Sequence, residues 1–197
     1  MIAIVDYGAG NLASVAKAIQ HLGAECVVSN DPDVVGHAEK WVIPGVGNFK
    51  ATAPLGKGKL GTALRDGVSS GQTPLLGICL GLQWMFEGSS EAPELSGLSV
   101  FRGRCTGFSD AVKSPHVGWD SVAMIGESRL LTGIPSGAYV YFTHSYRAPL
   151  CIDTVATCTY EEPFTAVVER GNLFGVQFHP EKSGDLGMHI LENFCAL

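Results

Sequence analysis

The first half of the chain alternates short apolar runs with amphipathic runs, and this alternation restricts the fold more than any other feature. Residues 2–5, 25–28, 41–43 and 74–78 are expected to be strands, of which 2–5 is apolar throughout and 74–78 is buried. After the first strand, apolar residues recur at helical spacing, and another helix is expected over residues 80–86. Strands that are apolar throughout are typical of a parallel sheet covered by helices on both faces. We therefore predict a three-layer α/β fold with a mostly parallel central sheet.

The second half has a different pattern, in which short strand-like runs are separated by turn residues. These runs cover residues 100–101, 139–142, 154–159, 166–168 and 173–177, and a last helix is expected over 185–194. Their spacing favours mixed or antiparallel additions to the sheet. No repeat, low-complexity segment or linker divides the chain, so we expect a single domain over residues 1–197.

Composition excludes several classes of protein. Hydrophobic residues make up 46% and charged residues 16%, which rules out a disordered chain. The net charge is −6 and the basic residues are scattered, so nucleic acid is not an expected partner. The N-terminus lacks a signal-peptide pattern, and no apolar stretch approaches the roughly 18 residues of a membrane span. The six cysteines contain no Cys-x-x-Cys pair. We expect a cytoplasmic protein with reduced thiols and no membrane partner.

One motif points to a different function. Residues 8–13, Gly-Ala-Gly-Asn-Leu-Ala, match a dinucleotide-binding fingerprint between a strand and a helix, and Asp31 follows at the spacing of a ribose-binding carboxylate. Against this, the last position is Ala, two residues separate the apolar strand from the first Gly, and Asp31 lies in a turn cluster. A tight turn is the preferred interpretation, and nucleotide binding stays open as an alternative.

The strongest chemical signal is at residues 77–81, Gly-Ile-Cys-Leu-Gly. A strand leads in, a helix leads out, and glycines flank Cys79 two positions away on each side, as in a nucleophile elbow with Cys in place of Ser. Such a turn exposes the sulfur at the carboxyl edge of the sheet and at a helix N-terminus, where the thiolate is favoured. Cys79 is thus the candidate nucleophile, whereas the other five cysteines are expected to be structural.

A thiol nucleophile needs a base, and His179 is the candidate. It follows the apolar strand that ends near residue 177, whereas His21, His37 and His189 lie in or near helical runs. Residues two apart in an extended segment point the same way, so we expect Glu181 beside His179, with Pro180 preventing a helix. A carboxylate in this place orients the imidazole and stabilises its protonated form.

A third element is the turn at residues 44–47, Pro-Gly-Val-Gly, which follows a strand. Its backbone N–H groups are free to face a carbonyl oxygen, so it is either an oxyanion hole or a plain turn. No cluster of His, Cys and carboxylates has metal-ligand spacing, so no metal site is predicted.

Taken together, residues 77–83 (Gly-Ile-Cys-Leu-Gly-Leu-Gln) and 175–181 (Gly-Val-Gln-Phe-His-Pro-Glu) resemble the class I glutamine amidotransferases. Within that class the chain is similar, over nearly its whole length, to the family of glutaminase subunits of imidazole glycerol phosphate synthase. The further segments that carry this resemblance are residues 4–12, 44–47, 115–119, 141–146 and 179–183.

The resemblance implies a mechanism and a set of site residues. Cys79 attacks the glutamine amide to form a thioester, His179 protonates the leaving ammonia and then activates water, and Glu181 orients His179. The same resemblance assigns the oxyanion hole to Val46 and Gly47, and the glutamine contacts to Gln83, Ser145 and Tyr146.

The resemblance also implies a partner. Ammonia passes to a separate (β/α)₈ synthase subunit, which makes imidazole glycerol phosphate and a carboxamide ribotide (AICAR) in histidine biosynthesis. Trp119, Tyr141 and Lys182 are expected to face this partner, and Asn11 to lie near the interface. No cofactor is implied. Asp120 stands where that family usually has Asn, and residues 102–104 are less apolar than in the family, which affects only the expected detail of the interface.

Other functions of related chemistry stay open. The chain could serve anthranilate, aminodeoxychorismate or pyridoxal phosphate synthesis, although the family motifs disfavour each of these. A cysteine peptidase or γ-glutamyl hydrolase on a related sheet is a second class, and it would act without a partner.

Overall fold

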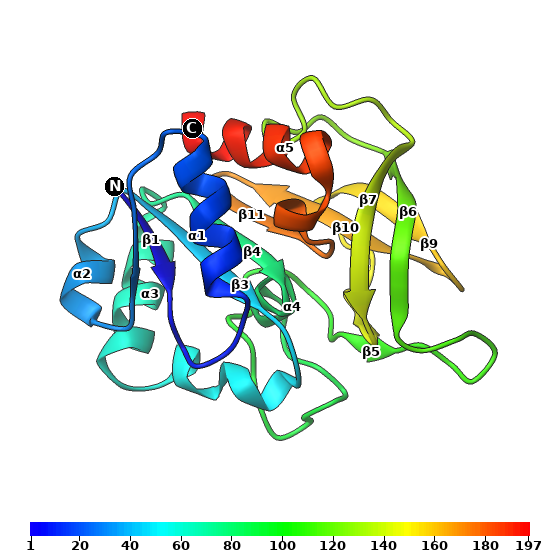
Figure 1. Cartoon of the computed structure of the whole chain (residues 1–197). Coiled ribbons are helices and arrows are strands. Elements are labelled where there is room, and N and C mark those ends of the chain that lie inside the picture. Colours follow the sequence, from blue (N-terminus) through cyan, green and yellow to red (C-terminus); the bar gives the residue numbers. More distant parts are fainter.

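A computed structural model describes residues 1–197, and its centre is one nine-stranded sheet with the order β2-β1-β3-β4-β11-β10-β9-β6-β7 (Figure 1). The strands are β1 (Ile2–Val5), β2 (Cys26–Ser29), β3 (Lys40–Gly45), β4 (Leu75–Cys79), β6 (His116–Met124), β7 (Ala138–His144), β9 (Thr154–Thr159), β10 (Pro163–Arg170) and β11 (Leu173–Val176). Two short strands, β5 (Thr106–Gly107) and β8 (Tyr146–Arg147), pair separately.

The parallel part of the sheet consists of β2, β1, β3, β4 and β11. Every residue of β1 and of β4 is buried, as the continuous apolar runs predicted. The remaining strands, β10, β9, β6 and β7, pair antiparallel. The predicted three-layer fold with antiparallel additions from the second half is therefore confirmed.

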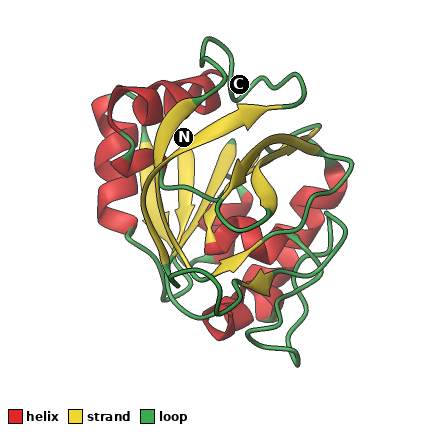
Figure 2. Cartoon of the chain, turned by 90° about the vertical axis from the view of Figure 1, so that its right-hand side faces the viewer, coloured by secondary structure: helices red, strands yellow, loops and turns green.

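Helices cover both faces of the sheet (Figure 2). They are α1 (Leu12–His21), α2 (Pro32–Gly36), α3 (Gly58–Ser70), α4 (Leu80–Met85) and α5 (Gly184–Ala196), with 3-10 helices η1 (Phe49–Gly56) and η2 (Pro180–Lys182). Helices α1 and α5 lie side by side and pack into one core, whereas α2, α3 and α4 pack into a second core on the other face. No helix is both long and apolar enough to span a bilayer.

The sequence-based assignment differs from the structure in several places. Strand β6 and helix α2 were not predicted, and two further differences have a physical cause. The predicted strand at 100–101 is wrong, because the backbone N–H groups of Val100 and Phe101 both donate to Met85 at the end of α4 instead of to a neighbouring strand. Helix α3 was not predicted, since its glycines hide a helical pattern. One of them, Gly67, faces Trp41, and a Cβ there would lie 2.0 Å from the indole ring.

The prediction of one domain over residues 1–197 stays a prediction. The sheet that runs unbroken from β2 to β7 agrees with it.

Candidate active site

Cys79 lies where β4 passes into α4, in a backbone conformation that side-chain-bearing residues rarely adopt. Its φ is 54° and its ψ −105°, and only Ser99 among the other non-glycine residues has a positive φ. The flanking glycines are required by close backbone contacts. A Cβ at Gly77 would lie 2.7 Å from the Gly81 carbonyl carbon, and one at Gly81 would lie 1.8 Å from the Ile43 oxygen. The geometry is that of the predicted nucleophile elbow.

The pairing of β11 with β4 brings the second half of the chain to Cys79. The strands run parallel, with Gly175 opposite Gly77 and Val176 opposite Ile78. Their carboxyl ends therefore meet at one edge of the sheet. Gln177, just beyond β11, donates from Nε2 to the Cys79 sulfur at 3.5 Å. His179 follows two residues later.

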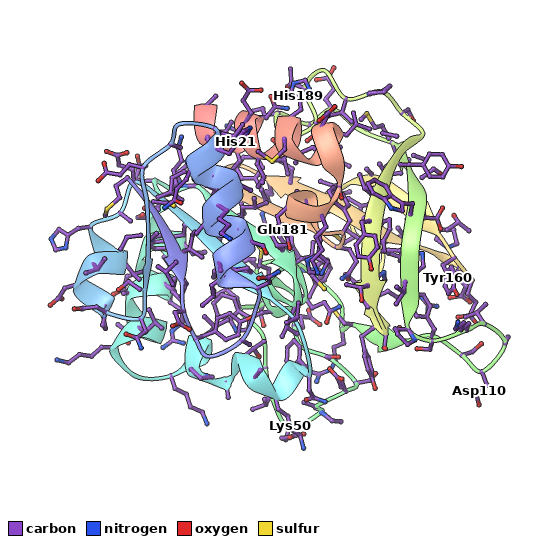
Figure 3. All side chains as sticks on the ribbon, viewed as in Figure 1. His21, Lys50, Asp110, Tyr160, Glu181 and His189 are labelled. Carbon is purple, nitrogen blue, oxygen red and sulfur yellow. The ribbon has the colours of Figure 1, made fainter.

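His179 and Glu181 form a buried pair, with 2.8 Å between Nδ1 and Oε1 and side chains only 2% and 1% exposed. In Figure 3, Glu181 lies near the centre of the view, whereas His189 lies at the upper edge of the molecule. The predicted contact is present, but the expected extended backbone is wrong. Pro180 begins the 3-10 helix η2, because its fixed φ suits the first position of a helix, and this turn places Glu181 beside the ring.

The electrostatics of the pair favour a protonated imidazole. Burial alone lowers the pKa of His179, but the side chains of Cys79 and Glu181 raise it to about 9. Nε2 of His179 has no hydrogen-bond partner, and the Cys79 thiol instead donates to the Thr143 carbonyl at 3.9 Å. A protonated His179 therefore has a free N–H for a reacting group beside the sulfur.

A pocket of about 260 Å³ opens at Cys79. Of the residues predicted for the site, Gly47, Cys79, Gln83, Ser145 and Tyr146 line it. The rest of the lining consists of residues for which the sequence predicted no role: Leu80, Glu91, Pro115, Thr143 and His144. Val46 does not line the pocket and is 38% exposed, so only one of the two predicted oxyanion-hole residues reaches it in this structure.

The comparisons with known proteins agree with this geometry. The family model described as "Glutamine amidotransferase class-I" matches residues 3–197. The chain belongs to the class I glutamine amidotransferase family.

Relatives within this family are similar over nearly their full length. "Imidazole glycerol phosphate synthase subunit HisH" of Thermococcus kodakarensis is 49% identical, with 100% of both chains covered. The HisH subunit of Methanopyrus kandleri is 46% identical, over 96% of this chain and 94% of its own, and that of Bacillus cereus is 41% identical, over 98% and 93%.

Solved structures show the same fold. A crystal structure of a glutamine amidotransferase superposes with a TM-score of 0.78 at 16% identity, covering 100% of both chains. The structure of PurLQS from Thermotoga maritima gives a TM-score of 0.71 at 17% identity, over 98% of this chain and 96% of that one. The class I amidotransferase fold therefore extends over the whole chain.

A buried polar network forms the floor of the pocket in this amidotransferase. Gln83 donates from Nε2 to the Tyr146 carbonyl at 2.7 Å and to Gln177 at 3.2 Å. The Tyr146 carbonyl also accepts from Nδ1 of His144 at 3.0 Å. Burial lowers the pKa of His144 to about 3, so this ring is neutral and its Nε2 is an acceptor for Nδ1–H of His116, 3.2 Å away.

Asp120 belongs to this buried network and does not lie on the surface expected to face the partner. Its carboxylate lies 3.4 Å from Nε2 of His116. Strand β6 alternates, with Trp119 exposed on one face and Asp120 half-buried on the other. The sequence did not reveal this network. His116 and His144 lie opposite each other on β6 and β7, and their proximity follows from a strand pairing that was not predicted.

The turn that carries His179 is tied to β7 by its backbone. The N–H of His179 donates to the Tyr141 carbonyl at 2.9 Å. The Ser183 hydroxyl completes the link, since it donates to the His179 carbonyl at 2.6 Å and accepts from the Tyr141 N–H at 3.0 Å. Ser183 is buried, so the hydroxyl is an internal bridge and a residue that sequence reasoning missed.

Three of the four predicted partner-facing residues come together at the surface. The rings of Trp119 and Tyr141 are 6.2 Å apart, and Nζ of Lys182 lies 5.9 Å from the Tyr141 ring centre. Trp119 is 54% exposed, which disagrees with a core position. Asn11 is the N-cap of α1, and its side-chain oxygen accepts from the Ser14 N–H at 3.4 Å.

The dinucleotide-like segment is a structural turn. Gly8 and Gly10 have φ of 88° and 110°, and Gly10 packs so closely on the end of β3 that a Cβ would lie 3.1 Å from the Pro44 oxygen. Asp31 caps α2 through a bond from the Asp33 N–H. No group of three or more His, Cys, Asp and Glu side chains is placed to hold a metal ion.

Proposed function

We propose that this chain hydrolyses glutamine to glutamate and ammonia and supplies the ammonia to a (β/α)₈ synthase subunit that makes imidazole glycerol phosphate and AICAR in histidine biosynthesis. The observation that carries the proposal is the meeting of Cys79 and the His179–Glu181 pair at the ends of the adjacent parallel strands β4 and β11. The full-length similarity to HisH subunits supports the choice of acceptor reaction.

In the first half-reaction, the Cys79 thiolate adds to the carbonyl carbon of the side-chain amide. The C–N bond then breaks, and protonated His179 gives the proton from its free Nε2 to the departing nitrogen, so that ammonia leaves and a γ-glutamyl thioester remains. The raised pKa of His179, about 9, suits a residue that must hold a proton at neutral pH.

In the second half-reaction, neutral His179 takes a proton from water as the water oxygen attacks the thioester carbonyl. The C–S bond breaks, glutamate leaves, and Cys79 is ready for another cycle. Glu181, bonded to Nδ1, keeps Nε2 directed at the reacting atoms and stabilises the charged ring.

The pocket has groups that suit glutamine. N–H groups of Val46 and Gly47 are proposed to stabilise the tetrahedral oxyanion. The side-chain N–H groups of Gln83 donate to Tyr146 and Gln177, so its side-chain oxygen is proposed to accept a hydrogen bond from the substrate. Glu91 adds a carboxylate for the α-ammonium group. Ser145 and Tyr146 complete the glutamine contacts.

The partner surface is proposed to adjoin this pocket. Tyr141 and Thr143 lie on the same face of β7, and the Thr143 carbonyl accepts the Cys79 thiol. Lys182 directly follows Glu181. Exposed aromatic residues with a nearby cation are typical of interface anchors. Docking here would enclose the ammonia released beside Cys79. A cytoplasmic location and reduced thiols belong to the same proposal.

The test is Cys79→Ala in the complex with the synthase subunit. We expect glutamine-dependent synthase turnover to fall at least about 10³-fold, because the covalent route is lost, while turnover with added ammonium stays near that of the wild type. Wild-type glutamine hydrolysis is expected to be very low in the free chain and to rise about 100-fold or more with synthase and its ligand.

Cys151→Ala is the matched control, because Cys151 lies outside the pocket and should leave both activities unchanged. Substantial glutaminase activity in Cys79→Ala would exclude Cys79 as the nucleophile. Equal hydrolysis with and without the synthase would contradict the proposed coupling, and a peptidase would show that behaviour.

A further inference from the structure

Three buried side-chain atoms in the molecule have no hydrogen-bond partner, and all belong to residues near Cys79. Two are Nε2 of His179 and Oε2 of Glu181, which belong to the proposed catalytic pair. The third is the hydroxyl of Tyr7, for which the proposed mechanism has no use. Tyr7 as a whole is 6% exposed.

The Tyr7 hydroxyl packs against Gly45, in the turn at residues 44–47 that is proposed to form the oxyanion hole. A Cβ built on Gly45 would lie 2.2 Å from this oxygen, 2.6 Å from Cβ of Leu80 and 3.2 Å from the Gly81 nitrogen. Gly45 is paired in register with Cys79. Burial, followed by the charge of Cys79, raises the pKa of Tyr7, so the hydroxyl keeps its proton and is a donor.

A phenylalanine would fill the same space without burying an unpaired hydroxyl. An orphaned buried polar group in an otherwise well-paired protein calls for an explanation, and a polar partner that arrives in another state of the site is one. Glycines at positions 45 and 47 permit backbone dihedral angles that other residues avoid, and Gly47 already has a φ of 100°.

One rotation of the Gly45–Val46 peptide would change two features of the turn. Val46 does not reach the pocket, and the Tyr7 hydroxyl has no acceptor. The Gly45 carbonyl and the Val46 N–H share one peptide plane and point in opposite directions. If the plane turns its oxygen toward the hydroxyl in the interior, the N–H turns to the opposite side.

We propose that Tyr7 is a positioning residue for the oxyanion hole: in the state that hydrolyses glutamine, its hydroxyl donates to the Gly45 carbonyl and thereby holds the Val46 N–H toward the pocket. The inference rests on the proposed glutaminase function and adds the residue that stabilises the active form of the turn. Tyr7 itself does not touch the substrate.

The test is Tyr7→Phe in the complex with the synthase, with ligand bound. We expect kcat for glutamine hydrolysis to fall about tenfold or more, with KM within about threefold, because an oxyanion donor acts on the transition state. The rate of Cys79 alkylation by iodoacetamide, and its pH profile, should stay unchanged, since displacement of iodide forms no oxyanion. The melting temperature of the free chain should be equal or higher, because an unpaired hydroxyl is removed.

Tyr160→Phe is the matched control. Its hydroxyl is paired, donating to the Lys113 carbonyl at 2.9 Å, and it lies at the far edge of the molecule (Figure 3). This variant should melt at a lower temperature and keep the wild-type kcat.

Each result decides between roles. Glutamine turnover by the wild-type complex tests the proposed glutaminase function independently of Tyr7. If the wild-type complex hydrolyses glutamine and Tyr7→Phe does so with the same kcat, the glutaminase function stands and only the role of Tyr7 is overturned. A shifted pH profile of alkylation in Tyr7→Phe would mean that the hydroxyl acts on the thiolate and would overturn the positioning role. A lower melting temperature for Tyr7→Phe would mean that the hydroxyl is already paired, and would overturn it too.

Discussion

The parallel and antiparallel parts of the sheet serve the protein in opposite ways. In the parallel part, β1 and β4 are buried along their whole length, and the chemistry lies only at the strand ends, where Cys79 and His179 meet. In the antiparallel part, β6 and β7 are largely buried on one face and more exposed on the other, and the more exposed face carries Trp119 and Tyr141. These two strands lie at the end of the sheet away from β2 (Figure 1).

This difference follows from how the two kinds of strand are covered. Helices on both faces leave the inner parallel strands β1 and β4 no surface except at their ends, so a reactive group there is held rigidly by backbone packing. A strand pair with one open face offers an extended surface that can bind another protein without disturbing the core. Two hydrogen-bonded contacts connect the open strand pair to the catalytic residues: the Thr143 carbonyl accepts from the Cys79 thiol, and the Ser183 hydroxyl bridges Tyr141 and His179.

The largest expected effect tests the tight packing of the parallel part. Gly81→Ala should destabilise the free chain by about 3 kcal/mol or more, because the new Cβ would lie 1.8 Å from the Ile43 oxygen. Gly126→Ala, at the end of β6, is the control, since its Cβ meets only Val155 at 3.6 Å. Urea unfolding measures the free energy of unfolding of both variants. A similarly small decrease in the two would contradict the proposed difference in packing between the two regions.

The next effect tests the open face. Trp119→Ala should weaken binding of the synthase by about 2 kcal/mol, roughly 30-fold, while the melting temperature of the free chain changes little, because the side chain is 54% exposed. Titration of labelled chain with synthase measures the affinity. Lys182→Ala should raise the ratio of glutamate to synthase product. Asp120→Asn, on the inner face of β6, is the control and should leave affinity within about twofold.

Normal affinity and coupling in Trp119→Ala, together with loss of folding, would place Trp119 in the core instead of the interface.

The smallest effect concerns the charge on His179. The folded-state pKa, about 9, is higher than the ordinary value of 6.5, so this group stabilises the fold fully below about pH 6.5, and the contribution is lost as pH rises through 9. Glu181→Gln keeps the shape of the pair but removes the charge. Wild type should therefore exceed the variant by about 1–2 kcal/mol at pH 6, and the difference should vanish near pH 10.

Urea unfolding at a series of pH values measures this difference. A difference that grows toward high pH would have the wrong sign and would show that Glu181 does not stabilise a charged imidazole.

The parts predicted correctly from the sequence are those with a strong local cause. Wholly apolar runs located β1, β3 and β4, and the glycines around Cys79 located the elbow, because contacts of 2.7 Å and 1.8 Å exclude any side chain there. The parts predicted wrongly had local signals that tertiary contacts overrode. Residues 100–101 look like a strand, yet both donate to the end of α4. His179 was expected in an extended segment with Glu181, yet Pro180 starts a 3-10 turn.

The elbow at Cys79, the covered parallel sheet and the membership of the amidotransferase family were all recognisable from local sequence patterns. Which strand lies beside β4 became known only from the folded chain. Because β11 returns from nearly the end of the chain to that place, His179 meets a cysteine that precedes it by 100 residues in the sequence. Strand neighbours are chosen by packing over long sequence separations, and the partnerless Tyr7 hydroxyl and the Ser183 bridge arise from the same packing.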